Sequence, residues 1–149
     1  MKKELKNTKK KNNKGFSLVE LIVVIAIMAV LMAVLAPAML RYVEKSRTQK
    51  DDSAAAEVRH SIEIALSDEN VYDKLNGDDA QVVITGSTGA ITYTAKSTGN
   101  VDPLKTEVDG TVGNPLKISS KTRKAQTCTF NVTFDSTKKT YTISDVDWK

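Results

Sequence analysis

Hydrophobic and polar positions divide this chain of 149 residues into three stretches with different patterns. The first, residues 1–15, is almost entirely polar. From Leu21 to Leu40 no residue is charged, and a helix of that length, rising about 1.5 Å per residue, measures roughly 30 Å, the thickness of a bilayer's hydrocarbon core. Beyond Leu40 apolar residues recur first at helical spacing and later in alternation. The pattern therefore predicts a membrane-spanning helix between a polar N-terminal segment and one folded domain.

One long helix is predicted from Phe16 to about Leu66, because good helix formers follow one another there and only Pro37 interrupts them. Proline lacks an N–H and crowds the carbonyl four residues earlier, so a kink or a locally loosened helix is expected at Pro37. After a charged collar at residues 41–52, apolar side chains recur at steps of three and four residues. These are Ala55, Val58, Ile62, Ala65 and Leu66. We expect this stripe to pack against a sheet.

Strands are predicted in the second half of the chain, where apolar and polar residues alternate with a period of two. Two such runs, 82–84 and 91–94, flank the turn-forming sequence Gly86-Ser87-Thr88-Gly89 and predict a hairpin. A second strand pair is predicted at the end of the chain, on either side of a polar turn at 135–139. Its shared apolar face consists of Cys128, Phe130, Val132, Phe134, Tyr141 and Ile143. One long helix packed on a small antiparallel sheet of about four strands, an α+β fold, buries both apolar surfaces.

Two stretches are predicted to connect these elements without regular structure of their own. Residues 70–79 are polar, and the longer segment 96–117 contains the turn-forming pairs Asp-Pro, Asp-Gly and Asn-Pro. A structureless connection as long as the second is uncommon unless it forms a binding surface. Asp102, Glu107 and Asp109 within it carry the oxygen ligands that calcium prefers, but their spacing matches no calcium-binding loop. Solvated acids are the preferred interpretation, and we predict no metal site and no cofactor.

The net charge of +4 belongs to the N-terminal segment. Residues 1–15 hold seven lysines against Glu4, a net of +6, which leaves −2 for the remainder of the chain. A basic run directly before a membrane span keeps that end of the chain in the cytoplasm. Nucleic-acid binding is the competing interpretation of a lysine run. We do not predict it, because this run adjoins the apolar segment.

One acid stands at the edge of the apolar run. An acid at the centre of a span costs on the order of 3 kcal/mol, less near an end, and often marks a functional position. Here the sequence Lys14-Gly15-Phe16-Ser17-Leu18-Val19-Glu20 precedes the run. It resembles the processing site of type IV prepilins and of the related pseudopilins of secretion and competence systems. The resemblance extends from Lys14 to about Leu40 and includes the proline at Pro37.

The resemblance implies a division of the chain and a role for each part. Residues 1–15 would be a class III leader peptide, cleaved between Gly15 and Phe16 by prepilin peptidase, which also methylates the new amine of Phe16. Residues 16–40 would anchor the precursor in the membrane and later form the filament core, and residues 41–149 would be the globular part of the pilin fold. Glu20, the fifth residue of the mature chain, would pair with the N-terminal amine of the neighbouring subunit.

Localisation and partners follow from the same resemblance. The precursor would cross the cytoplasmic membrane once, with its N-terminus in the cytoplasm, and would then enter an extracellular filament on the cell surface. Its partners would be further copies of itself in a helical filament, the prepilin peptidase, the pilus assembly platform and minor pilins. Adhesion, twitching motility, DNA uptake and protein secretion all use such filaments, and the sequence does not choose among them.

Several function classes stay open at this point. The preferred one is the major pilin of a type IV pilus, because the chain is short and retains Glu20. The main alternative is the major pseudopilin of a type II secretion or competence system. A further alternative is a monomeric, signal-anchored extracellular binding domain. A freely secreted domain cut after Ala36 is disfavoured, because Pro37 follows directly and proline blocks such cleavage.

Catalysis is not expected. The chain has one histidine, His60, and one cysteine, Cys128, and no glycine-rich phosphate loop joins a strand to a helix. His60 is predicted on a polar, solvated helix face without a second ligand for a metal ion or a nucleophile to activate. Cys128 is expected to be a small buried side chain, and a single cysteine permits no intramolecular disulfide. We therefore predict no catalytic residue.

Overall fold

The computed structural model describes residues 15–149 of the chain. Apart from Gly15, the predicted leader lies outside the described residues. The chain falls into two compact units, with the boundary between Leu40 and Arg41. Where the leader ends is not tested by this division and stays a prediction.

Helix α1 (Leu18–Ala65) is the long helix that the sequence predicts, with each end within two residues of its expected position. Helical structure continues through Pro37 without a break. The kink predicted at Pro37 therefore stays a prediction, and no interruption of the helix is found there.

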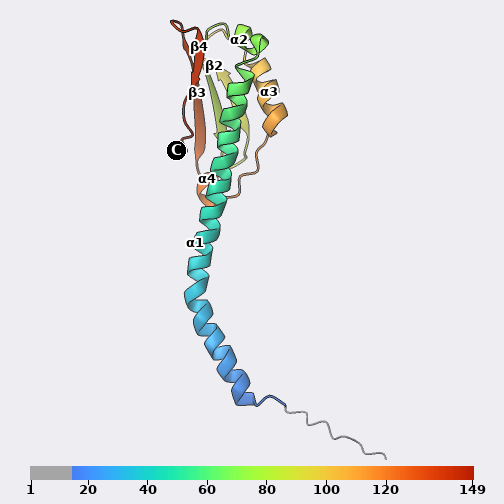
Figure 1. Ribbon diagram of the computed structural model, residues 1–149, viewed down its shortest axis with the longest axis vertical. Helices are drawn as coiled ribbons and strands as arrows, with labels where there is room; N and C mark the ends of the chain where they lie inside the picture. Colours follow the sequence, from blue (N-terminus) through green and yellow to red (C-terminus); the bar gives the residue numbers. More distant parts are fainter. Residues whose placement is uncertain (1–14) are drawn as a thin grey trace, which may run out of the picture. The chain divides into compact units, whose positions relative to one another are not determined.

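The second unit contains a four-stranded antiparallel sheet, as predicted (Figure 1). Strands β1 (Ala80–Thr85) and β2 (Ile91–Ala95) form the first hairpin, and β3 (Thr127–Asp135) and β4 (Thr140–Ile143) form the second. The strand order is β2-β1-β3-β4, so the antiparallel pairing of β1 with β3 joins the two hairpins. In this register Val82 lies opposite Phe130.

One hydrophobic core lies between this sheet and the second half of α1. Of the predicted helical stripe, Leu66 is only partly buried, and the other four residues, Ala55, Val58, Ile62 and Ala65, are buried. The sheet contributes the alternating residues that the pattern predicted. These include Val82, Ile84, Cys128, Phe130 and Val132, all buried. The fold class is thus confirmed as α+β, with the long helix packed on the sheet.

The first connection predicted to lack structure contains a helix, α2 (Glu69–Leu75). The carboxylate of Asp68 caps it, accepting hydrogen bonds from the amides of Asn70 at 2.8 Å and Val71 at 3.4 Å. Val71 and Leu75, one turn apart, are buried in the core. Two apolar positions among polar neighbours are too few to reveal a helix by periodicity, so the prediction for 70–79 is wrong.

The prediction for 96–117 is wrong for a related reason, because helix α3 (Asp102–Val112) occupies its middle. The Asp102-Pro103 pair begins a helix rather than a turn, since proline is favoured in the first helical turn, where its missing N–H is not needed. Leu104 and Val108, one turn apart, are fully buried. Their burial stabilises a segment whose own helix propensity is lowered by Gly110.

Two carboxylates of α1 tie the collar to the segment before β3, where the short helix α4 (Lys121–Lys124) lies. The fully buried Asp51 accepts hydrogen bonds from the amides of Ser119, at 2.9 and 3.1 Å to its two oxygens, and of Ser120, at 2.7 Å. Oε1 of Glu44 accepts from the Ser120 hydroxyl and from the Lys121 amide, both at 2.7 Å. These hydrogen bonds lower the pKa of Glu44, and the bond from the Ser120 hydroxyl has the largest effect. We call Glu44, Asp51 and these donors the carboxylate clamp.

Candidate assembly site

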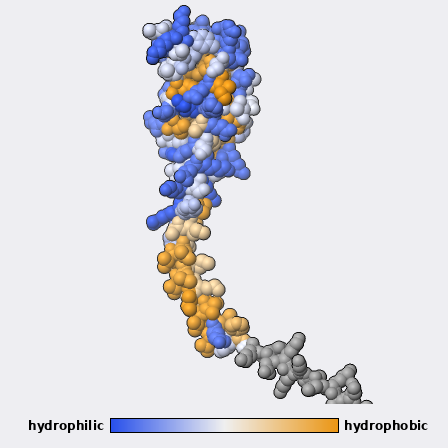
Figure 2. Space-filling model, in the orientation of Figure 1, coloured by the Kyte–Doolittle hydropathy of each residue, from blue (hydrophilic) through white to orange (hydrophobic). Residues whose placement is uncertain are grey.

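The first unit exposes an apolar surface. Every residue from Leu18 to Leu40 is exposed in the single chain, and among the described residues α1 is the helix that is long and apolar enough to cross a membrane. Figure 2 shows this stretch as an orange, hydrophobic surface. An apolar surface of this extent is unfavourable in water, so it requires either a bilayer or apolar segments of other chains.

Small side chains follow one face of this part of α1. Ala26, Ala29, Ala33 and Ala36 are spaced by three, four and three residues, which places them on the same side of a helix. Small residues in such an arrangement allow the backbone of another helix to approach closely. The segment is therefore suited to helix packing as well as to crossing a bilayer.

Ser17 and Glu20 form a reciprocal cap at the start of α1. The Ser17 Oγ accepts a hydrogen bond from the amide of Val19 at 3.4 Å, and Oε2 of Glu20 accepts one from the amide of Ser17 at 2.9 Å. This is a capping box, which satisfies main-chain N–H groups at the helix N-terminus that have no partner within the helix. Within the described part of the chain, the other oxygen of Glu20, Oε1, accepts no hydrogen bond. Glu20 thus holds one carboxylate oxygen one residue from Phe16 and leaves the other available.

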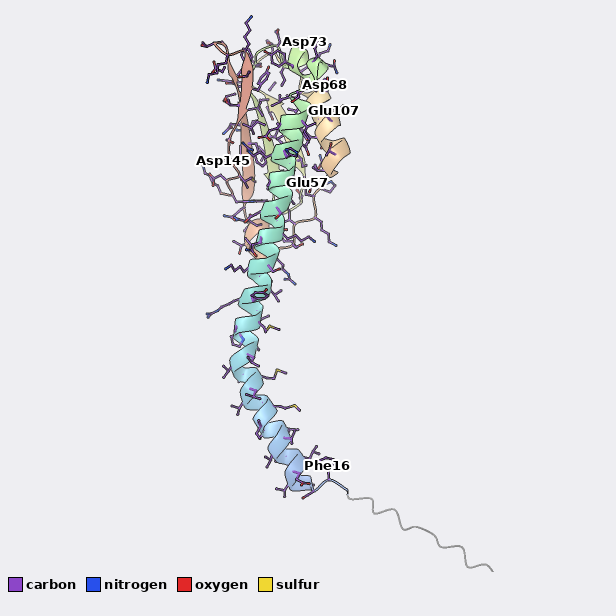
Figure 3. The ribbon with its side chains drawn as sticks, viewed as in Figure 1. Phe16, Glu57, Asp68, Asp73, Glu107 and Asp145 are labelled. Carbon is purple, nitrogen blue, oxygen red and sulfur yellow. The ribbon has the colours of Figure 1, made fainter. Side chains whose placement is uncertain are left out.

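The predicted cleavage position, between Gly15 and Phe16, is exposed and has free space around it. Phe16 is 90% exposed, and Figure 3 shows it at the beginning of the α1 ribbon. No atom lies within 4 Å of the point where a Cβ would stand on Gly15. Packing within the described chain therefore does not require glycine at position 15, and a requirement for it would come from an enzyme that acts there.

The predicted site residues fall into two places along α1. Gly15, Phe16 and Glu20 lie within six consecutive residues at the helix start, whereas Pro37 lies far along the helix. The proposed cleavage, methylation and pairing concern only the first group. Their roles in processing and assembly stay predictions from the sequence.

The alternative calcium site is not supported. Asp109 lies on α3, where its carboxylate accepts hydrogen bonds from the Tyr93 hydroxyl at 2.7 Å and from the Asn114 amide at 3.2 and 3.3 Å. Burial raises the pKa of Tyr93 most, and the hydrogen bond to Asp109 raises it further. Within residues 15–149, no three His, Cys, Asp or Glu side chains are grouped so as to hold a metal ion. His60 is exposed as predicted, with its Nδ1 3.5 Å from Glu63.

The carboxylate clamp was not predicted from the sequence, although one signal for it exists. Asp51 stands four residues before Ala55 and therefore continues the buried stripe of α1 toward the N-terminus. A charged residue in the register of a buried stripe indicates a buried polar partner. The capping box also had a signal, the Ser-x-x-Glu sequence before an apolar run.

Together these features define a class of protein: a subunit with an exposed apolar N-terminal helix, followed by a small α+β unit. The comparison with known proteins supports this class. Residues 10–36 match the prokaryotic N-terminal methylation motif. The fimbrial protein EcpC of Eikenella corrodens is 33% identical over 103 residues, which cover 60% of this chain and 67% of that protein.

A second relative is the prepilin peptidase-dependent protein A of Clostridium perfringens (strain 13 / Type A). It is 33% identical over 86 residues, which cover 57% of this chain and 59% of that protein. No solved structure gives a significant match. On the motif and these relatives, the chain belongs to the type IV pilin family.

Proposed function

We propose that this chain is the major structural subunit of a type IV pilus, made as a membrane-anchored precursor and polymerised through α1. The observation that carries the proposal is the start of α1. Along the chain, the exposed Gly15-Phe16 peptide bond is followed directly by a carboxylate held at the helix N-terminus, and then by an exposed apolar helix. The name of the Eikenella relative, a fimbrial protein, supports a structural rather than a catalytic role.

The first step of the proposal is cleavage after Gly15 by prepilin peptidase, followed by methylation of the Phe16 amine. The N-terminal methylation motif at residues 10–36 and the name of the Clostridium relative support this step. Gly15→Ala is expected to leave a full-length, membrane-bound precursor. Gly110→Ala is the matched control, since a Cβ at that position also meets no atom within 4 Å. Intact mass and N-terminal sequencing distinguish Met1 from a methylated Phe16, and normal processing of Gly15→Ala would refute the cleavage position.

The second step is pairing of Glu20 with the new amine of a neighbouring subunit. In a filament core made of apolar helices, the amine of Phe16 would lie in a medium where an unpaired charge is costly. Glu20 is the only acid between Phe16 and Leu40, so it is the available partner on a neighbouring helix. The contact would also set the register between subunits.

The capping box allows this charge role to be separated from a purely structural one. Glutamine can replace glutamate in a capping box, because its side-chain oxygen still accepts from the N-cap amide. Glu20→Gln therefore keeps the start of α1 intact and removes the charge, whereas Glu20→Ala removes both. We expect both variants to be processed and both to yield few filaments in sheared surface material.

Each result of this comparison is decisive. If Glu20→Gln assembles as well as the wild type while Glu20→Ala does not, the residue acts only as a cap and the pairing proposal is wrong.

Sheared filaments that contain mature chain favour a pilus subunit, and an intact N-terminus at Met1 without polymers would favour the signal-anchored alternative. A role as major pseudopilin predicts mature chain that stays in the membrane fraction.

A further inference from the structure

Cations gather at one end of the second unit. We define the basic end as residues 41–52 of α1 together with residues 117–124, which include α4. It contains eight lysines and arginines against three acids, a net of +5. The rest of the unit, residues 53–116 and 125–149, contains seven cations against thirteen acids, a net of −6. The near-neutral charge of the unit as a whole therefore hides a strong separation.

The three acids of the basic end are all engaged within it. Glu44 and Asp51 form the carboxylate clamp, and Asp52 pairs with Arg123 at 2.8 Å. Asp51 is fully buried, so it contributes nothing to the exposed surface. These carboxylates hold α4 against α1 and leave the surrounding lysines without acidic partners.

Six cations of the basic end are exposed and, within the described residues, have no carboxylate within 4.0 Å. They are Arg41, Lys45, Lys50, Lys117, Lys121 and Lys124. Elsewhere in the unit three of the six lysines, Lys96, Lys138 and Lys149, each pair with an aspartate. Exposed cations on a framework held by buried hydrogen bonds form a preorganised surface for an anionic partner.

The position of these cations along the chain indicates the partner. Arg41 directly follows the apolar run that ends at Leu40, and α4 is bonded to Glu44, only four residues beyond that end. If residues 21–40 cross a bilayer, Arg41 and Lys45 follow the end of the span by only one and five residues. Their charges are then within reach of the attraction to anionic headgroups, which decays over roughly 8 Å at physiological salt.

We propose that the basic end binds anionic phosphate headgroups of the membrane that holds the subunit before assembly. This inference rests on the proposed membrane-anchored precursor. A second copy of the chain is the competing anionic partner, but its acids are dispersed. In Figure 3, Glu57 lies on α1, Asp68 lies directly before α2 and Asp73 lies within it. Glu107 lies on α3, and Asp145 lies in the C-terminal segment. Headgroup binding would restrain the second unit at the membrane surface and make release into the filament depend on lipid charge and salt.

The test uses the full chain in lipid nanodiscs, where both membrane faces are accessible. One set contains only phosphatidylcholine and the other about 30% phosphatidylglycerol, enough for an anionic surface. Lysines are acetylated with a water-soluble reagent, and the extent at each site is measured by mass spectrometry. Lys45, Lys50 and the three lysines of residues 117–124 are expected to react about fivefold more slowly in the anionic discs. Lys74, Lys105 and Lys139, exposed elsewhere on the unit, serve as internal controls.

A matched pair of variants extends the test. Neutralising Lys117, Lys121 and Lys124 together with glutamine is expected to remove the protection of Lys45 and Lys50. The triple glutamine variant at Lys74, Lys105 and Lys139 is expected to leave it unchanged. Circular dichroism of both variants shows whether they are folded, and about 0.5 M salt should abolish the protection, because the Debye length is then only a few ångströms.

Four outcomes overturn the proposal. Equal acetylation in neutral and anionic discs excludes headgroup binding, and so does protection of the basic end that survives its triple neutralisation. Protection that depends on the number of chains per disc, and not on lipid charge, assigns the surface to a second copy. Failure of the chain to enter discs at all also overturns the inference, but by refuting the membrane-anchored precursor, and flotation of the discs distinguishes that failure from the others.

Discussion

The replacement Asp51→Ala tests how much the carboxylate clamp stabilises the second unit. Asp51 is the fully buried charged residue among those that the structure describes, and it lies on α1 while its donors lie nearly seventy residues later. Removing its carboxylate leaves the amides of Ser119 and Ser120 without their acceptor. Ser120 is buried and Ser119 only partly so, which allows water to reach the second amide more easily.

The expected loss follows from those two amides. A buried donor left without a partner costs about 1–3 kcal/mol, with bonds to charged acceptors at the upper end. Taking the upper part of that range for Ser120 and the lower part for Ser119 gives a loss of about 3 kcal/mol. For a domain of this size, 1 kcal/mol corresponds to roughly 4–5 °C, so Asp51→Ala should lower the Tm by roughly 12–15 °C.

Thermal unfolding of the full chain in detergent micelles measures this loss. Near-UV circular dichroism reports the second unit, because its single tryptophan, Trp148, is buried and lies 5.3 Å from the guanidinium of Arg123. Asp145→Ala is the matched control: it removes the same side chain and charge from a fully exposed site, whose nearest cation is 3.9 Å away. The control should stay within about 0.5 kcal/mol of the wild type. If Asp51→Ala melts within 2 or so degrees of that control, the clamp does not stabilise the unit as argued.

Four further predictions concern the same unit. Hydrogen bonds hold the pKa of Glu44 below its ordinary 4.5. The ionised carboxylate therefore stabilises the fold above pH 4.5, and this stabilisation is lost as the pH falls through the lowered pKa. Glu44→Gln should show a shallower fall of Tm below pH 4.5 than the wild type. Burial raises the pKa of Cys128 to about 11, so iodoacetamide near neutral pH should modify this thiol only after denaturation, as intact mass will show. Gly110→Ala should raise the stability of α3 by up to about 1 kcal/mol. Gly89→Ala should lower the Tm, because its Cβ would stand 1.8 Å from the carbonyl oxygen of Leu116 at a φ of +72°; equal melting of the two alanine variants would contradict both expectations.

The sequence by itself determined the features that depend on local composition and period. A run of uncharged residues from Leu21 to Leu40 identifies a membrane-length helix because length and apolar character are enough for that inference. Alternation likewise predicted both hairpins, since successive side chains of a strand point to opposite faces. The motif from Lys14 to Glu20 indicated the family, which the comparisons then showed.

Only the tertiary structure decided the rest. Helices α2 and α3 are stabilised by two buried residues each, Val71 with Leu75 and Leu104 with Val108, and this burial exists only when the core forms. The clamp and the basic end join α1 to residues about seventy positions later, a pairing that no local pattern contains. Local propensity predicts an element when the element can form largely by itself; where its stability comes from distant partners, the fold must be known first.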